Sequence, residues 1–128
     1  MLCIASVAGV LAIATAEFTL DWTHSTALTR WVETWTIEPG GLRPVTARVQ
    51  GSGAGMDIPN DAVRTDQGWH YMVHLPPRPL IHLAASGLTP DPWRLCARGT
   101  CHDLGALPQA PIRLWSGSCT AMPEGDPS

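Results

Sequence analysis

The sequence predicts an all-β domain, a small sandwich or barrel of short antiparallel strands with a Gly-rich loop. Its 12 glycines and 12 prolines are spread along the 128 residues and divide them into short runs, which is typical of strands and turns. Several of these runs alternate apolar and polar side chains, the pattern of a half-buried strand. No run combines helical periodicity with recognisable caps. Short strands at this spacing favour a sandwich or a barrel.

The length of the chain suits one domain, and we expect a single β domain over residues 1–121 with a flexible C-terminal tail at 122–128. The net charge is −3, and all eight cationic side chains are scattered arginines. A nucleic-acid-binding protein normally concentrates positive charge in a patch. The composition therefore excludes nucleic acid as the expected partner.

The first sixteen residues, MLCIASVAGVLAIATA, allow two interpretations. The stretch is apolar and ends in a small-x-small pattern, as a signal peptide does. However, the first cationic side chain is Arg30, and cleavage would remove Cys3. We therefore favour a hairpin of strands at 2–7 and 10–15 joined at Ala8-Gly9. An export signal would then lie upstream.

The clearest strands follow, at residues 17–24 and 30–38. One face of the second strand carries Trp31, Glu33, Trp35 and Ile37. The turn signal Pro39-Gly40-Gly41 comes next, and residues 42–50 alternate again. The last two strands are predicted to form a hairpin.

Glycine and proline residues divide the rest of the chain into short segments. A Gly-rich loop occupies 51–56, and residues 57–67 are expected to be irregular. Four further strands are predicted at 69–75, 80–85, 93–97 and 112–115.

The four cysteines, Cys3, Cys96, Cys101 and Cys119, allow three pairings. Because Cys96 and Cys101 can close a short loop, we favour Cys96–Cys101 together with Cys3–Cys119. An even number of cysteines in a small, loop-rich chain favours disulfides if the compartment is oxidising. We expect an extracytoplasmic location, in the periplasm or at the outer face of the cytoplasmic membrane, where such bonds persist.

Several strings resemble one family, the domain of unknown function 1850. They are FTLDWTHS at 18–25, WVETW at 31–35, ARVQGSGAGM at 47–56, LAAS at 83–86, WRLC at 93–96 and CHDL at 101–104. The Leu2-Cys3 opening is similar to that of the family as well, and GSGAGM is the most specific string. The chain departs from the family pattern after Ser25, where an acidic residue is common; here the first acid is Glu33.

The resemblance implies a role beside a transporter. Members of the family are bacterial and are typically encoded beside permeases of TAXI-type TRAP transporters, which take up organic acids using ion gradients. We therefore expect a non-catalytic accessory domain whose partner is the permease, the substrate receptor or a small organic anion. No cofactor is expected.

The Gly-rich loop is a candidate anion site. Successive backbone N–H groups in such a loop can form an anion-binding nest, and His24 or Arg48 could complete a carboxylate site. The alternative is a tight connection in which only glycine fits. No nucleotide-binding motif is complete, because the loop lacks both a third glycine at Met56 and a following lysine.

His24-Ser25 resembles part of a catalytic dyad, but neighbours on a strand point to opposite faces. Ser52 lacks the glycine of a nucleophile elbow two positions before it. A hydrolase built on Ser25 or Ser52 is therefore the least favoured hypothesis, and no catalytic residue is predicted.

The alternative function is a copper- or zinc-binding module that uses clustered histidine and methionine. His70, Met72 and His74 alternate on one predicted strand, and His82 could join them from the next. The two outer histidines of the strand would be roughly 13 Å apart, which favours scattered surface histidines. Cys96, Cys101 and His102 lack a second pair of zinc ligands.

Glu33 stands between two tryptophans on one strand face, which is unusual for a fully buried face. That face is either a core edge or a surface for a partner or ligand. The residues predicted to bind a ligand or partner are His24, Ser25, Glu33, Ser52, Gly53, Gly55 and Met56.

Overall fold

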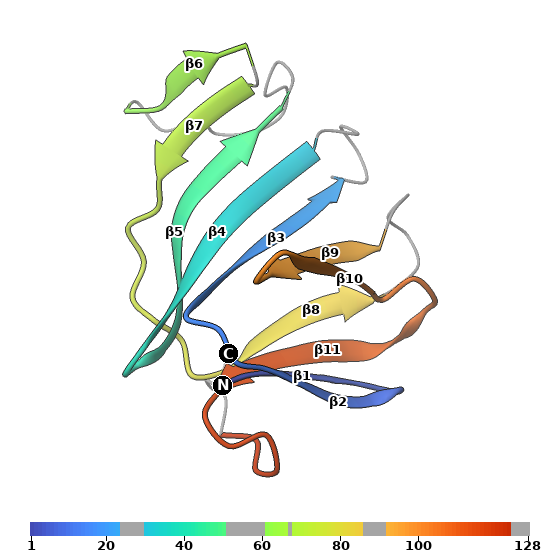
Figure 1. Cartoon of the computed structure of the whole chain (residues 1–128). Helices are drawn as coiled ribbons and strands as arrows, with labels where there is room; N and C mark the ends of the chain where they lie inside the picture. The colour runs from blue at the N-terminus through green and yellow to red at the C-terminus, as the bar shows by residue number, and fades with distance from the viewer. Residues whose placement is uncertain (24–29, 51–60, 67, 86–91, 124–128) are drawn as a thin grey trace.

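A computed structural model of the chain describes residues 1–23, 30–50, 61–66, 68–85 and 92–123. Two antiparallel sheets pack face to face as a sandwich (Figure 1). The smaller sheet has the order β2-β1-β11-β8, and the larger has the order β10-β9-β3-β4-β5-β7-β6. The all-β prediction is confirmed; of its two forms the sandwich is right and the closed barrel is wrong.

The smaller sheet consists of β1 (Leu2–Ser6), β2 (Gly9–Ile13), β8 (Ile81–Ala85) and β11 (Gln109–Ser116). The larger sheet consists of β3 (Glu17–Thr23), β4 (Arg30–Glu38), β5 (Gly41–Val49), β6 (Val63–Thr65), β7 (Gly68–Met72), β9 (Trp93–Ala97) and β10 (Thr100–Leu104). The sheets converge near the two termini and diverge toward β6 and β7 (Figure 1).

The core lies between the sheets and draws its side chains from the inner faces of both. Phe18, Leu20 and Leu95 contribute from the larger sheet, and Ile112 and Leu114 contribute from the smaller one. All five are buried. This arrangement follows from period-2 alternation, which gives each strand one apolar face.

The N-terminal hairpin is confirmed. β1 lies between β2 and β11 and pairs antiparallel with each. Its residues Leu2, Cys3, Ile4 and Ala5 are all buried. The first strand is therefore an interior element of the smaller sheet.

The structure contains two strands that the sequence does not predict, and two predicted strands have different bounds. β6 lies within the stretch expected to be irregular, and all three of its residues are exposed, so it has no apolar face to signal it. β10 is reached through the two-residue turn Arg98-Gly99, both with positive φ, which is the geometry of a tight hairpin. β7 ends at Met72 and β11 begins at Gln109, so the first is shorter and the second longer than predicted.

Pro44 lies inside β5, where proline would normally interrupt a ladder. The register between β4 and β5 shifts at this point, because Thr34 pairs with Thr46 whereas Trp35 pairs with Pro44. The extra residue is a bulge, and a bulge is one of the few places where a sheet tolerates proline.

Both predicted disulfides are present. Cys3 and Cys119 join the two ends of the chain across a separation of 116 residues, with their Cα atoms 5.3 Å apart. Cys96 and Cys101 lie opposite each other in the β9–β10 hairpin, with their Cα atoms 4.0 Å apart. Among the described residues, no helix is long and apolar enough to cross a membrane.

The two disulfides should differ in their contribution to stability. In the chain-entropy model, closing a loop of 116 residues stabilises by about 5 kcal/mol and closing a loop of 5 residues by about 2 kcal/mol. We therefore expect Cys3→Ser/Cys119→Ser to lower the free energy of unfolding by more than Cys96→Ser/Cys101→Ser. Urea denaturation of both double variants measures the difference, and equal losses would contradict the entropic account.

Gly41 is expected to tolerate no larger residue. It has φ +125°, and an added Cβ would lie 2.1 Å from the backbone oxygen of Arg78. Gly9 has nearly the same φ, +123°, but nothing lies within 4 Å of its added Cβ. Both alanine variants incur the strain of positive φ, about 1–3 kcal/mol, and Gly41→Ala should be destabilised by more. Thermal unfolding of the matched pair isolates the steric clash.

Candidate functional site

Strand alternation divides the larger sheet into an inner face, toward the core, and an outer face. Glu33 lies opposite Leu20 on β3 and opposite Ala47 on β5, and Ala47 lies opposite Tyr71 on β7. Residues paired across antiparallel strands share a face, and Leu20 is buried in the core. Glu33 is therefore on the inner face, and the prediction that it shares that face with Trp31, Trp35 and Ile37 is confirmed.

The Glu33 carboxylate is the one acidic group of β4 that faces inward. The Trp35 indole Nε1–H donates a hydrogen bond to Glu33 Oε1 at 3.3 Å. Burial raises the pKa of Glu33 above its ordinary value of 4.5, and the hydrogen bond from Trp35 opposes part of that rise. Burial also raises the pKa of Tyr71, with a further contribution from the negative charge of Glu33. The two groups therefore interact along one row of the sheet.

Aromatic rings surround this carboxyl group along the inner face. The rings of Trp22 and Trp31 stack at 5.8 Å, and those of Phe18 and Trp35 stack at 6.0 Å. Trp22 also contacts Trp93 of β9 at 4.8 Å. The face around Glu33 is thus a continuation of the core, and of the two interpretations open in the sequence this placement favours the core edge.

The outer face of the larger sheet holds the main cavity, with a volume of about 460 Å³. Seven side chains from β4, β5, β6 and β7 line it along two cross-strand rows, and Asp61 lines it as well. One row holds Val32, Arg48, His70 and Val63, and the other holds Thr34, Thr46 and Met72. Its size is within the range of small-molecule sites.

The polar groups of this cavity converge from adjacent strands. Arg48 lies directly opposite His70 in the β5–β7 ladder. The His70 Nε2 atom is buried and has no hydrogen-bond partner among the described residues. Buried polar atoms in proteins are nearly always paired, so such an atom calls for an explanation such as a ligand. Guanidinium, imidazole and the hydroxyls of Thr34 and Thr46 together suit a carboxylate.

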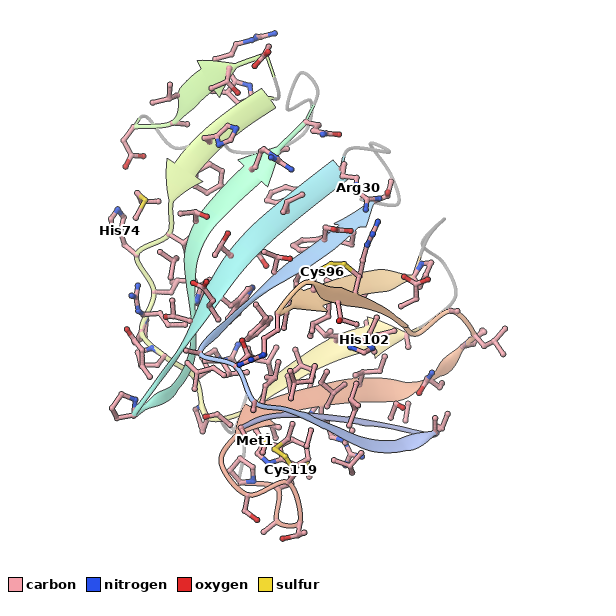
Figure 2. All side chains as sticks on the ribbon, in the orientation of Figure 1. Met1, Arg30, His74, Cys96, His102 and Cys119 are labelled. Carbon is pink, nitrogen blue, oxygen red and sulfur yellow. A yellow bond between two sulfur atoms is a disulfide. The ribbon has the colours of Figure 1, made fainter. Side chains whose placement is uncertain are left out.

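Asp61 adds a negative charge at the rim of the cavity. Its carboxylate Oδ2 lies 3.9 Å from His74 Nε2, and both side chains are largely exposed. Figure 2 shows His74 at the outer border of the molecule, beyond the end of β7. The cavity is therefore lined by the cationic guanidinium of Arg48 and by the exposed carboxylate of Asp61.

The two histidines of the metal hypothesis, His70 and His74, are separated by the end of β7. His70 lies within β7, whereas His74 lies after the strand has ended at Met72. No group of three or more His, Cys, Asp or Glu side chains among the described residues is arranged to hold a metal ion. Met72 lines the cavity with His70, so the binding of a soft metal by these two residues stays a prediction.

Six of the predicted binding residues lie outside the described part of the chain: His24, Ser25, Ser52, Gly53, Gly55 and Met56. The strand ends that flank them are described. Arg30 forms an ion pair with Asp21 across β3 and β4, and the Gln50 N–H donates to Arg30 O at 2.9 Å. The first segment is thus bounded by paired strand ends on both sides, and the second follows one, at Gln50.

The cavity itself was not predicted as a site. Its β4 and β5 side chains fall on the outer side of alternating strands, where the sequence indicates only exposure to solvent, and Asp61 and Val63 fall in the stretch expected to be irregular. His70 and Met72 are indicated by the sequence only as metal ligands. Arg48 was considered only as a helper of the Gly-rich loop. The signal lies in the pairing of β5 with β7, which places Arg48 against His70 across 21 intervening residues, and no pattern within either strand reports it.

The fold is a disulfide-linked β-sandwich with a polar cavity on one sheet face. A family model, Domain of unknown function (DUF1850), matches residues 18–104, which is more than half of the chain. The chain belongs to this family. No curated protein and no solved structure matches it.

The pKa of Glu33 leads to a prediction on stability. Because its pKa is raised in the folded state, the unfolded chain loses its proton first as the pH rises, and the folded state becomes less stable above about pH 4.5. Glu33→Gln keeps an acceptor for Trp35 and removes this penalty. We expect a higher melting temperature than wild type at neutral pH, with the gain vanishing below that pH. A gain that is the same at both pH values would contradict the assignment.

Proposed function

We propose that the chain is a non-catalytic, extracytoplasmic accessory domain of a TAXI-type TRAP transport system, and that it binds a small organic anion on the outer face of its larger sheet. The observation that carries the binding proposal is the cavity in which Arg48 and the unpartnered His70 Nε2 lie side by side. The transporter link rests on membership of the family.

The chemistry of the lining supports a carboxylate ligand. Arginine is charged at every physiological pH and offers a planar pair of donors that matches a carboxylate. Hydrogen bonds between charged groups are about twice as strong as neutral ones. The apolar side chains of Val32, Val63 and Met72 provide a wall for the carbon skeleton of an organic acid.

The acidic rim narrows the ligand class. A dicarboxylate would bring its second charge toward Asp61, and like charges at close range repel. A monocarboxylate brings no second charge toward Asp61. We therefore expect monocarboxylates to bind more tightly than dicarboxylates with the same carbon chain.

The extracytoplasmic assignment is supported by the two disulfides, because such bonds persist in oxidising compartments. The partner in the transport system is the permease or the substrate receptor, in line with the organic acids that such systems carry. An accessory domain that binds the transported acid could hold it close to the receptor.

The binding site is tested by calorimetric titration with a series of mono- and dicarboxylates. Arg48→Gln should weaken binding of the best ligand by about 10- to 100-fold, because a hydrogen bond to a charged group contributes about 1.5–3 kcal/mol. Arg43→Gln is the matched control: Arg43 is on the same strand but pairs with Glu38 at 2.9 Å and does not line the cavity.

Two results would contradict the proposal. One is the absence of binding to any carboxylate, and the other is an equal loss in the Arg48 and Arg43 variants. Parallel titration with Cu²⁺ and Zn²⁺ tests the alternative, because metal binding that His70→Ala abolishes would assign the cavity to a metal.

A further inference from the structure

The edge strand of the smaller sheet presents an open, apolar surface. β2 pairs with β1 on one side and has no described strand on the other. An apolar row crosses the inner face of this sheet through Ile81, Leu114, Ile4 and Leu11. The first three side chains are buried, but Leu11 is 40% exposed and its neighbour Val10 is 54% exposed. The row therefore continues to the edge and stops there uncovered.

The hydrogen-bonding pattern shows which backbone groups face outward. The Gly117 N–H donates to Met1 O at 3.0 Å, so the odd-numbered residues of β1 bond to β11 and the even-numbered ones to β2. Ile4 is opposite Leu11, so Leu11 bonds inward to β1. Bonding alternates along a strand, and Val10 and Ala12 therefore direct their N–H and C=O groups to the open edge.

The other described edges carry the usual protection against strand addition. β6 has the charged side chain of Arg64, and β10 has that of Asp103. At β8, the Trp93 indole N–H donates a hydrogen bond to the Ala84 carbonyl oxygen at 2.8 Å. β2, with the sequence GVLAI, has no charge, no proline and no such contact in the described part of the chain. Proteins normally protect an edge of this kind, and an unprotected one pairs with another strand.

We propose that β2 pairs antiparallel with β2 of a second copy of this chain, so that the two smaller sheets form one continuous sheet across a two-fold axis. The register of the two β2 strands follows from the backbone N–H and C=O groups that face the open edge. Val10 of each copy exchanges two hydrogen bonds with Ala12 of the other, and the two Leu11 residues lie opposite each other. That central pair is not hydrogen-bonded, which is the geometry that brings side chains closest.

A second copy fits this edge because the strand is self-complementary. A two-fold contact must place the same surface on both sides, and every pair in this register is apolar and uncharged. A hollow of about 290 Å³ lies between β2 and β10. Ile4, Leu11 and Leu104 form its apolar part, and His102 and Asp103 add polar groups from β10. Leu11 of the second copy would project toward this hollow and extend the apolar row of the sheet.

Five-residue strands form a small interface, which is typical of weak or transient association. We therefore expect reversible dimers with a dissociation constant on the order of micromolar or weaker. The contact is distant in the fold from the outer face of the larger sheet, so dimer formation leaves the carboxylate cavity accessible.

Sedimentation equilibrium over a wide range of concentrations tests the proposal. Wild type should show a monomer–dimer equilibrium. Leu11→Lys sets two ammonium groups against each other across the two-fold axis and should weaken dimerisation by at least about tenfold. Part of the loss should be recovered at high salt, because salt screens exposed charges. Val63→Lys is the matched control, since Val63 is an exposed apolar residue of an edge strand in the other sheet.

The register is tested separately with Leu11→Cys, which adds one thiol to a chain whose described cysteines are all paired. Opposed residues at this type of pair have Cα atoms about 4.5 Å apart, within the reach of a disulfide. Oxidation with oxidised glutathione should give a covalent dimer, whereas Val63→Cys should stay monomeric. A wild type that is monomeric at all concentrations, or Leu11→Lys and Val63→Lys variants that associate alike, would overturn the proposal.

Discussion

The pairing of β3 with β4 determines on which side of the larger sheet every later side chain lies. Leu20 opposite Glu33 and Trp22 opposite Trp31 set the inner face, and the same alternation passes through β5 to β7. A slip of one residue would turn Glu33 outward and Arg48 into the core. The buried Trp35 of β4 and Ala47 of β5 oppose such a slip, because it would expose both of them. The core thus fixes the position of the polar groups on the opposite face.

The two ends of the chain complete that core. The family match covers residues 18–104, a span that includes only β8 of the four strands in the smaller sheet. β1, β2 and β11 lie outside it, yet Leu2, Ile4, Ile112 and Leu114 are central to the packing between the sheets. The Cys3–Cys119 disulfide joins these terminal strands at the point where they meet (Figure 2). The folded unit is therefore larger than the segment that identifies the family.

The fold separates the surfaces to which we assign binding. The cavity with Arg48 and His70 is on the outer face of the larger sheet, and the open edge at β2 is on the smaller sheet. Ligand binding and self-association would then use different sheets, and neither would block the other. Glu33, which is on the inner face, belongs to neither surface, and its raised pKa reflects burial among tryptophans.

The sequence by itself determined the all-β class and most of the strands, because alternation and turn residues are local signals. It favoured the N-terminal hairpin and the two disulfide pairings without deciding them, and the structure confirms both. It could not locate β6 and β10, since the first has no buried face and the second is defined by the turn at Arg98-Gly99. Nor could it choose between sandwich and barrel. Only the tertiary structure decided that Arg48 and His70 meet on one face and that β2 is left at an open edge. The reason is physical: both depend on which strands are neighbours, and the burial that selects those neighbours is distributed over the whole core.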